Sequence, residues 1–393
     1  MTQAFEHMLY LLGAGARGYD ISAESMDMEA VRKVSIQQGV WPLVYKAAEP
    51  TVNVTPWRSE FILSVARNVA RKEFTLSVLK KLEEAGVRYC LMKGAAIATL
   101  YHEPECRISG DTDIFINPAD EPKVEKILSE LGYSFESRDK NDHHLQAIHP
   151  VGGLLEVHVR MYSKPTEKIV FNGKIHYSDK FDKISIDDEE FYTMNAYDGL
   201  VYLTAHYIKH FLGTGCGIRQ ILDLLLYMER NKDEIDFDKY NALLCHLSYD
   251  KLIDVIKSIG GKYFGFDYPV VYPELMEELL TDMEKGGTFG YMADDRTNFY
   301  SMYCRARSDK LSDRIYMAFN REDHLVKKLF PSKEAMVQRG YKYASKDFLL
   351  PMAWCNRFFD LSLKKVKETI ADDSPEKRTK NRLDMIRRFG MIK

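Results

Sequence analysis

The stretch Leu91–Ile116, LMKGAAIATLYHEPECRISGDTDIFI, places two carboxylates, Asp111 and Asp113, one residue apart at the start of an apolar segment. The segment DTDIFI is rich in β-branched and aromatic residues and is therefore expected to be a strand. Because side chains on a strand alternate between its two faces, both aspartates should share one face, with Ile114 and Ile116 on the other. Two like charges so close together repel each other, so a cation is expected between them.

The composition describes a globular chain without a dominant charge. Of 393 residues, 45% are apolar and 12% aromatic, enough for about two or three domains. The formal net charge of −3 argues against a surface that binds nucleic acid over the whole chain. The six cysteines form no CxxC pair, a pattern expected of free thiols in a reducing cytoplasm. The N-terminus lacks the basic start of a signal peptide, and no apolar run approaches the ~18–20 residues of a membrane span, so a cytoplasmic protein without membrane contact is expected.

Residue patterns divide the chain into three expected regions. Residues 1–85 should form N-terminal helices, the last one starting with Thr55 as its N-cap and stopping at Gly86. Residues 86–190 alternate short strands with helices, and residues 191–393 return to helical periodicity with a break at 329–332. The expected fold class is α+β, a small mixed sheet flanked by N-terminal and C-terminal helices.

Magnesium fits the two aspartates, because it binds through one or two carboxylates and keeps waters or substrate phosphates as its other ligands. A third carboxylate, Glu156, lies between apolar residues in LLEVHVR, the expected partner strand of HHLQAIHP in a hairpin. A turn made by Gly152-Gly153 would put His149 opposite Glu156. His158 shares the face of Glu156 and is expected either to support the site or to be a satisfied strand histidine. A solvated pair of acids at a strand end is the alternative for the aspartates.

Groups suited to phosphate precede the aspartates. Lys93-Gly94 ends the first expected strand, where a glycine lets the backbone approach a phosphate closely. Arg107 lies four residues before Asp111, and an arginine can bind a triphosphate through two parallel hydrogen bonds. Ser109 lies between them. The alternative for Lys93 is a solvated lysine at a strand end.

Lys93-Gly94, RISGDTDIFI and LEVHV together resemble the nucleotidyltransferases of the DNA polymerase β superfamily, and most of all its bacterial branch of uncharacterised nucleotidyltransferases. The segments GVWPLVYK, AHYIKHFL…IRQILDLL and LFPSKEAMVQRGY are similar to that branch too, so the likeness covers nearly the whole chain. The portion from Lys93-Gly94 through RISGDTD is also similar to the nucleotidyltransferase toxins of abortive-infection systems. The wider superfamily usually has Gly-Ser where this chain has Lys93-Gly94, with a shorter gap to the acids.

The resemblance implies transfer of a nucleoside monophosphate from an NTP, for example ATP, to a hydroxyl, with residues 86–190 as the nucleotidyltransferase core. Two Mg²⁺ ions, or Mn²⁺ in their place, would clamp the attacking and leaving oxygens. Asp111 and Asp113 would hold both ions, and Glu156 would hold the ion that activates the acceptor. The groups implied to bind the nucleotide phosphates are Lys93, Gly94, Arg107 and Ser109.

The acceptor is less well defined by the sequence. His206, His210 and Arg219 of the later helices could line its pocket with His158, although packed histidines between domains are the simpler interpretation. The near-neutral charge favours a small molecule with a hydroxyl. One alternative is toxin-like transfer to RNA or a protein, and another is a non-catalytic nucleotide-binding module. An RNA would be held by the basic residues of the last segment, Lys377, Arg378, Lys380, Arg382, Arg387 and Arg388.

Overall fold

The computed structural model describes residues 1–136, 144–163, 166–178, 180–213, 215–288 and 375–392, with the single positions 290, 336, 341, 352 and 356. The chain forms two compact units: Met1–Arg296 with Phe389–Met391, and Thr297–Arg388 with Ile392–Lys393. The boundaries at residues 85 and 190, which separate the three expected regions of the chain, stay a prediction. The predicted break at 329–332 and the cysteines Cys304 and Cys355 lie outside the described residues. The described cysteines, Cys90, Cys106, Cys216 and Cys245, are free thiols.

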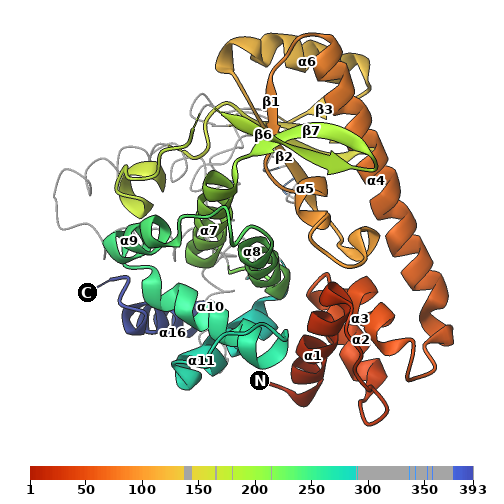
Figure 1. Ribbon diagram of the computed structural model, residues 1–393, viewed down its shortest axis with the longest axis vertical. Helices are drawn as coiled ribbons and strands as arrows, with labels where there is room; N and C mark the ends of the chain where they lie inside the picture. Colours follow the sequence, from red (N-terminus) through yellow and green to blue (C-terminus); the bar gives the residue numbers. More distant parts are fainter. Residues whose placement is uncertain are drawn as a thin grey trace. The chain divides into compact units, whose positions relative to one another are not determined.

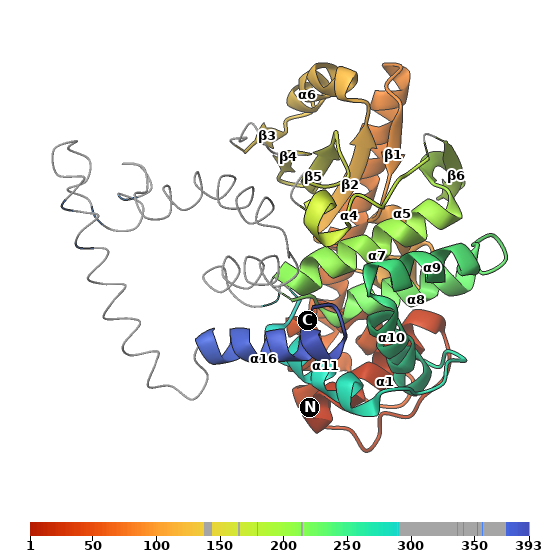
Figure 2. The ribbon, with the colours of Figure 1, turned by 90° about the vertical axis from the view of Figure 1, so that its left-hand side faces the viewer.

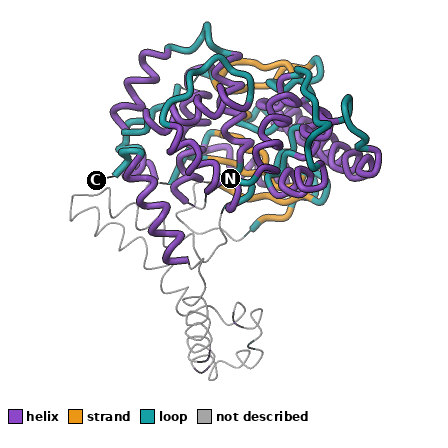
Figure 3. Tube along the Cα trace, turned by 90° about the horizontal axis from the view of Figure 1, so that it is seen from below, coloured by secondary structure: helices purple, strands orange, loops and turns teal. Residues whose placement is uncertain are grey.

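The first unit contains a seven-stranded sheet, with the helices of residues 196–286 below it in the view of Figure 1. Its strands are β1 (Tyr89–Leu91), β2 (Asp111–Ile116), β3 (Ser134–Phe135), β4 (His144–His149), β5 (Gly153–His158), β6 (Phe181–Ile186) and β7 (Glu189–Met194). Their order across the sheet is β3-β4-β5-β2-β1-β7-β6. The pairs β2–β5 and β1–β7 are parallel and the others are antiparallel. In the described part of the chain, all strands belong to this sheet, and helices flank it (Figure 3). The predicted α+β class is confirmed.

The helices divide into those before and those after the sheet. The first group is α1 (Gln3–Arg17), α2 (Met28–Gln37), α3 (Trp41–Ala48) and α4 (Arg58–Glu84). Two helices lie between strands, α5 (Ala95–Ala98) and α6 (Glu121–Glu130). The later group is α7 (Ala196–Gly213), α8 (Ile218–Arg230), α9 (Phe237–Leu247), α10 (Asp250–Tyr263) and α11 (Pro273–Gly286), with α16 (Pro375–Arg388) in the second unit. Short helical turns are η1 (Thr55–Trp57), η2 (Pro104–Cys106), η3 (Pro118–Asp120) and η4 (Thr166–Val170). Among the described residues, no helix is both long and apolar enough to cross a membrane.

The long helix α4 starts later than predicted. Thr55 opens the 3₁₀ turn η1 rather than capping the α-helix, which begins at Arg58. Pro56 fits that turn, because its missing N–H is not needed there. The end is as predicted: the chain leaves the helix at Gly86, whose φ of +70° favours glycine.

Alternation along the strands gives the sheet an apolar face and a polar face. Ile114 of β2 and Val157 of β5 are fully buried on the apolar face. Leu79 of α4 and Leu128 of α6 belong to the same hydrophobic core. The intervening residues of β2 and β5, which include Asp113, must therefore point to the other face. Figure 2 shows α4 on the far side of the sheet from α7.

The hairpin β4–β5 differs from the prediction in its turn. The turn holds three residues, so His149 pairs with Gly153, and Gln146 lies opposite Glu156. The predicted pairing of His149 with Glu156 is wrong, and the ring of His149 stacks on Phe74 of α4 instead. Its Nδ1 accepts hydrogen bonds from the backbone N–H groups of residues 151 and 152, which closes the longer turn.

We expect Leu79→Ala to lower the free energy of unfolding by about 2–5 kcal/mol, because the side chain is fully buried and its removal leaves a cavity. Leu63→Ala on the same helix is the control, since Leu63 is 55% exposed and its loss should change stability by no more than about 0.5 kcal/mol. Urea unfolding followed by far-UV circular dichroism measures both. Equal changes in the free energy of unfolding for Leu79→Ala and Leu63→Ala would contradict the packing of α4 against the core.

Candidate active site

The cation between the two aspartates is a lysine. Nζ of Lys93 lies 3.1 Å from Oδ2 of Asp111 and 2.9 Å from Oδ2 of Asp113. Lys93 follows β1, and β1 pairs with β2, so the sheet itself brings the three groups together. Burial disfavours the charged amine, but the two carboxylates outweigh burial and raise the pKa of Lys93. The ammonium therefore stays charged and offsets the repulsion between the aspartates.

The third carboxylate lies beside them. In the parallel pair β2–β5, Asp113 is the register partner of Glu156. One oxygen of each of Asp111, Asp113 and Glu156 can be chosen so that all three lie within 4.8 Å of one another. Burial opposes ionisation of Asp111, but Lys93 lowers its pKa overall. Burial also opposes ionisation of Glu156, but its pKa is lowered by a hydrogen bond from His158 and by neighbouring positive charges. Three carboxylates thus converge on the polar face of the sheet.

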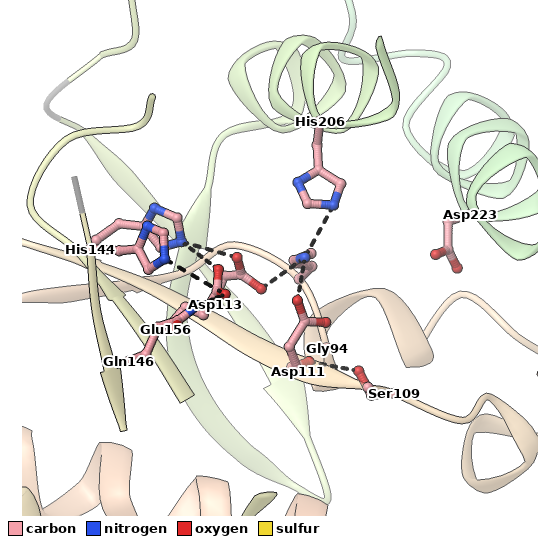
Figure 4. A network of polar contacts seen from close by, with 12 residues as sticks. Gly94, Ser109, Asp111, Asp113, His144, Gln146, Glu156, His206 and Asp223 are labelled. Atoms are coloured by element: carbon pink, nitrogen blue, oxygen red, sulfur yellow. Dashed lines mark hydrogen bonds and ion pairs between the residues drawn. The ribbon is translucent and has the colours of Figure 1, made fainter. Parts of the chain in front are cut away.

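Residues of the neighbouring strands hold these carboxylates in place (Figure 4). Nε2 of His158 lies 3.1 Å from Oδ1 of Asp113 and 3.5 Å from Oε2 of Glu156. Burial would lower the pKa of His158, but its hydrogen bonds to the two carboxylates raise it. Nε2 of Gln146 donates to Oε1 of Glu156 at 3.0 Å. The sequence analysis missed Gln146 and His144 here, because the assumed two-residue turn placed His149 opposite Glu156.

Arg107 does not face the carboxylates. Its Nε and Nη2 donate to the two carboxylate oxygens of Asp223 at 2.7 and 2.8 Å, and its Nη1 donates to the carbonyl of Gly94 at 3.3 Å. Only 3% of Arg107 is exposed. In this geometry Asp223 occupies the guanidinium of Arg107, and the expected contact with a triphosphate stays a prediction. Arg107 instead ties α8 to the turn after β1.

Two further residues expected to bind nucleotide lie at the ends of β1 and β2. Gly94 has a φ of +69°, a conformation that other residues rarely adopt, and it opens the short helix α5. Oγ of Ser109 donates to the carbonyl of Asp111 at 2.9 Å, and its N–H donates to Oδ1 of Asn68 at 3.2 Å. Ser109 therefore also fixes the entry to β2. Their contact with phosphate stays a prediction.

Helix α7 directs His206 toward the carboxylates (Figure 4). Nε2 of His206 lies 3.2 Å from Nζ of Lys93. Burial and the positive charge of Lys93 lower the pKa of His206 well below its usual value, so its neutral ring accepts from the ammonium. His210 follows one turn later with its ring centroid 4.5 Å from that of His206, and burial lowers its pKa to about 3. The two histidines thus lie together on the helix face near the site, as their spacing predicts.

Arg219 of α8 lies beside the buried ion pair between Arg107 and Asp223. Its Nη1 donates to the carbonyl of Ile108, and its Nε is 4.0 Å from Oδ2 of Asp223. Burial and the charge of Arg107 lower its pKa. In this position Arg219 holds the segment before β2, and its expected contact with an acceptor stays a prediction.

Lys209 is a residue that the sequence analysis missed. It lies on α7 between His206 and His210, and it forms no hydrogen bond or ion pair with the part of the chain that the structure describes. Burial lowers the pKa of Lys209, while its interactions with the carboxylates of Glu156, Asp113 and Asp111 oppose that shift. The signal was present in the sequence, because positions i, i+3 and i+4 of a helix share one face. Among the described residues Lys209 thus has no partner, and it shares its helix face with His206 and His210.

Comparison with known proteins assigns the chain to a family. Residues 24–253 match the model of a family described as uncharacterised nucleotidyltransferase, which covers more than half of the chain. The chain belongs to this nucleotidyltransferase family. The comparison with curated proteins gave no match. The predicted family resemblance is confirmed.

Two solved structures are similar to parts of this nucleotidyltransferase-family chain. The lincosamide antibiotic adenylyltransferase LnuA, bound to lincomycin, is 16% identical with a TM-score of 0.30 and matches 39% of this chain and 94% of its own. An antigenic nucleotidyltransferase-like protein from Paracoccidioides brasiliensis is 14% identical with a TM-score of 0.29, matching 58% of this chain and 96% of its own. Both TM-scores are low, so family membership rests on the sequence match.

We expect Asp223→Asn to lower the free energy of unfolding by about 3–5 kcal/mol at neutral pH, because it leaves Arg107 buried without its counter-charge. Burial alone would raise the pKa of Asp223, but Arg107 lowers it below the usual value. The ion pair therefore stabilises the fold above pH ~4 and is lost as the pH falls below that value. When the pH is lowered from about 5 to about 3, the free energy of unfolding of Asp223→Asn should therefore fall by less than that of the parent.

Urea unfolding at several pH values measures this difference. Glu190→Gln is the matched control, because Glu190 forms an exposed ion pair with Lys183 at 2.5 Å. Exposed pairs contribute little, so the control should follow the parent at every pH. A similar decrease in the free energy of unfolding in Asp223→Asn and Glu190→Gln would contradict the structural role of the Arg107–Asp223 pair.

Proposed function

We propose that this chain transfers a nucleoside monophosphate from an NTP to a hydroxyl acceptor at the polar face of β2 and β5. The observation that carries the proposal is the convergence of Asp111, Asp113 and Glu156, three carboxylates from two neighbouring strands. Family membership supports nucleotidyl transfer in general. The metal, the roles of individual residues and the acceptor belong to the proposal.

The donor set suits magnesium. All three groups offer carboxylate oxygens, which Mg²⁺ prefers, and manganese accepts the same ligands. Asp111 and Asp113 would hold two ions, and Glu156 would complete the site for the ion next to the acceptor. When bound, such ions lower the pKa of the attacking hydroxyl and neutralise charge on the leaving pyrophosphate.

Lys93 then takes a second role. Its ammonium lies between the carboxylates that the ions would share, so divalent cations and Lys93 compete for the same oxygens. A lysine side chain has four rotatable bonds and can turn its ammonium away from the aspartates. We infer that Lys93 turns toward the nucleotide phosphates when the aspartates bind metal, beside the backbone of Gly94 and Ser109. Arg107 acts on the phosphates only through Gly94, whose carbonyl it holds.

Lys209 is the second phosphate ligand that we propose. It comes from α7, opposite the sheet, and has no carboxylate partner among the described residues to displace. A charged hydrogen bond to phosphate contributes more than a neutral one, and a lysine amine binds phosphate as a point charge. His206 and His210, neutral and one turn apart, would flank it.

A cavity that is lined by Phe115, two residues after Asp113 on β2, is a candidate pocket for a compact acceptor. Its volume is about 340 Å³, within the range of small-molecule pockets. Its lining includes Phe115, which follows Asp113 on the same face of β2, and the side chains of Tyr162, Tyr177, Met194 and Asp198. The lining also contains charged residues, among them Arg160, Glu167 and Lys180, and such a mixture of aromatic and polar groups suits a small organic molecule that carries a hydroxyl. We therefore propose a small-molecule acceptor, with RNA or protein as the alternative.

We expect Asp111→Asn to abolish both nucleotidyl transfer and the magnesium-dependent part of NTP binding, because it removes a shared metal ligand. Calorimetry with a non-hydrolysable NTP, with and without Mg²⁺, measures binding. Intact-mass analysis of candidate hydroxyl compounds after incubation with each NTP measures transfer. Asp182→Asn, an exposed aspartate on β6, is the control that should leave both unchanged. Equal binding by the parent with and without magnesium would argue against the metal site.

We expect Lys209→Ala to weaken magnesium–NTP binding about tenfold or more, the loss of one charged hydrogen bond. The fold should be unaffected, because Lys209 has no partner in the described part of the chain. Lys232→Ala, at an exposed position beyond α8, is the control for the loss of one positive charge. Calorimetry with the non-hydrolysable NTP decides, and an unchanged dissociation constant in Lys209→Ala would remove this lysine from the site.

A further inference from the structure

A second group of potential metal ligands shares Glu156 with the carboxylate cluster. It consists of His144, Glu156 and His158, and one ligand atom from each can be chosen so that all lie within 4.8 Å of one another. Nε2 of His144 is 3.8 Å from Oε1 of Glu156, and Nε2 of His158 is 3.5 Å from Oε2. The rings of the two histidines are 5.1 Å apart between centroids. Both imidazoles therefore lie close to the carboxylate of Glu156.

The backbone holds this group rigidly. His144 and His158 are direct register partners in the antiparallel pair β4–β5, and Glu156 lies two residues before His158 on the same face. Figure 4 shows His144 and Glu156 on their two strands, directed toward the same region. Sites built on strands keep their geometry better than sites built on loops. The ligands are thus placed by the same hydrogen-bond ladder that forms the sheet.

The chemistry of this group differs from that of the aspartates. Two imidazole nitrogens and one carboxylate oxygen favour zinc and other late first-row ions over magnesium, which prefers oxygen ligands only. Ligand atoms around tetrahedral zinc lie ~3.3 Å apart, given zinc–ligand bonds of about 2.0–2.2 Å. The contacts of 3.8 and 3.5 Å, which reach different oxygens of Glu156, are slightly longer than that spacing, and one ligand atom of each residue lies within 4.8 Å of the others.

We propose that His144, Glu156 and His158 bind a transition-metal ion of the zinc type, with water in the fourth position. The site excludes magnesium by its nitrogen ligands. Because Glu156 also belongs to the carboxylate cluster, an ion here withdraws one of its three carboxylates, and it takes Nε2 of His158 away from Asp113. Zinc is therefore an antagonist of magnesium at this sheet. Only this antagonism rests on the proposed function; the zinc site itself does not.

Calorimetry with zinc chloride or magnesium chloride, without nucleotide, tests the site. We expect His144→Ala to weaken zinc binding at least about tenfold, the loss that even an outer-shell substitution can cause, while magnesium binding is unchanged. Asp111→Asn should do the opposite, losing magnesium and retaining zinc. Cobalt(II) gives a second readout, because the parent and Asp111→Asn should show visible absorption bands of a four-coordinate ion that His144→Ala lacks.

Two variants keep the test decisive. His144→Cys preserves a zinc ligand and should restore tight binding, with a new thiolate-to-cobalt band in the near ultraviolet. His246→Ala is the control, because His246 is exposed next to the exposed Cys245 and could bind metal at the surface. It should bind zinc like the parent. Zinc binding that is unaffected by His144→Ala, or lost equally in His144→Ala and Asp111→Asn, overturns the proposal. Absence of nucleotidyl transfer would not affect these results.

Discussion

The parallel pairing of β2 with β5 is the constraint on which the rest of the structure depends. Its register places Asp113 beside Glu156 and, through alternation, places Ile114 beside Val157 on the other face. One set of backbone hydrogen bonds therefore builds the hydrophobic core and the polar cluster together. A slip of one residue would turn the carboxylates into the core and the isoleucines toward α7. The apolar face, through its burial against α4 and α6, thus fixes the geometry of the charged face.

The charged side chains before and after Gly94 in the sequence are neutralised by different partners. Before it, Lys93 neutralises the aspartates within the cluster. After it, Arg107 is neutralised by Asp223 of α8 and holds the carbonyl of Gly94. A buried ion pair stabilises a fold weakly, because desolvation offsets most of the attraction, but loss of one partner is costly. The pair is better explained as a positioning device that joins α8 to the turn carrying Lys93.

The sequence predicts the parts of this site that depend on local periodicity. The shared face of Asp111 and Asp113, the polar position of Glu156, and the shared helix face of His206 and His210 all follow from alternation along a strand or a helix. The partner of Arg107 was not predictable in this way, because Asp223 is distant in sequence and only folding brings it close. Likewise, His144 and Gln146 depend on the turn length of the hairpin, where a third turn residue moved His149 to the opposite face.

The formal charges of the cluster explain how it can be stable alone and still attract cations. Asp111, Asp113 and Glu156 carry three negative charges, and Lys93 supplies one positive charge. The difference, three minus one, leaves two negative charges in a partly buried region where electrostatic interactions are strong. Protonation of His158, whose pKa is raised by Asp113 and Glu156, reduces that excess by one more. A single divalent ion that left Lys93 in place would therefore balance the cluster while His158 is neutral. In the proposed mechanism Lys93 turns away when metal binds, which leaves three negative charges to face two divalent ions, so the second ion would need the negative charge of a nucleotide triphosphate as well.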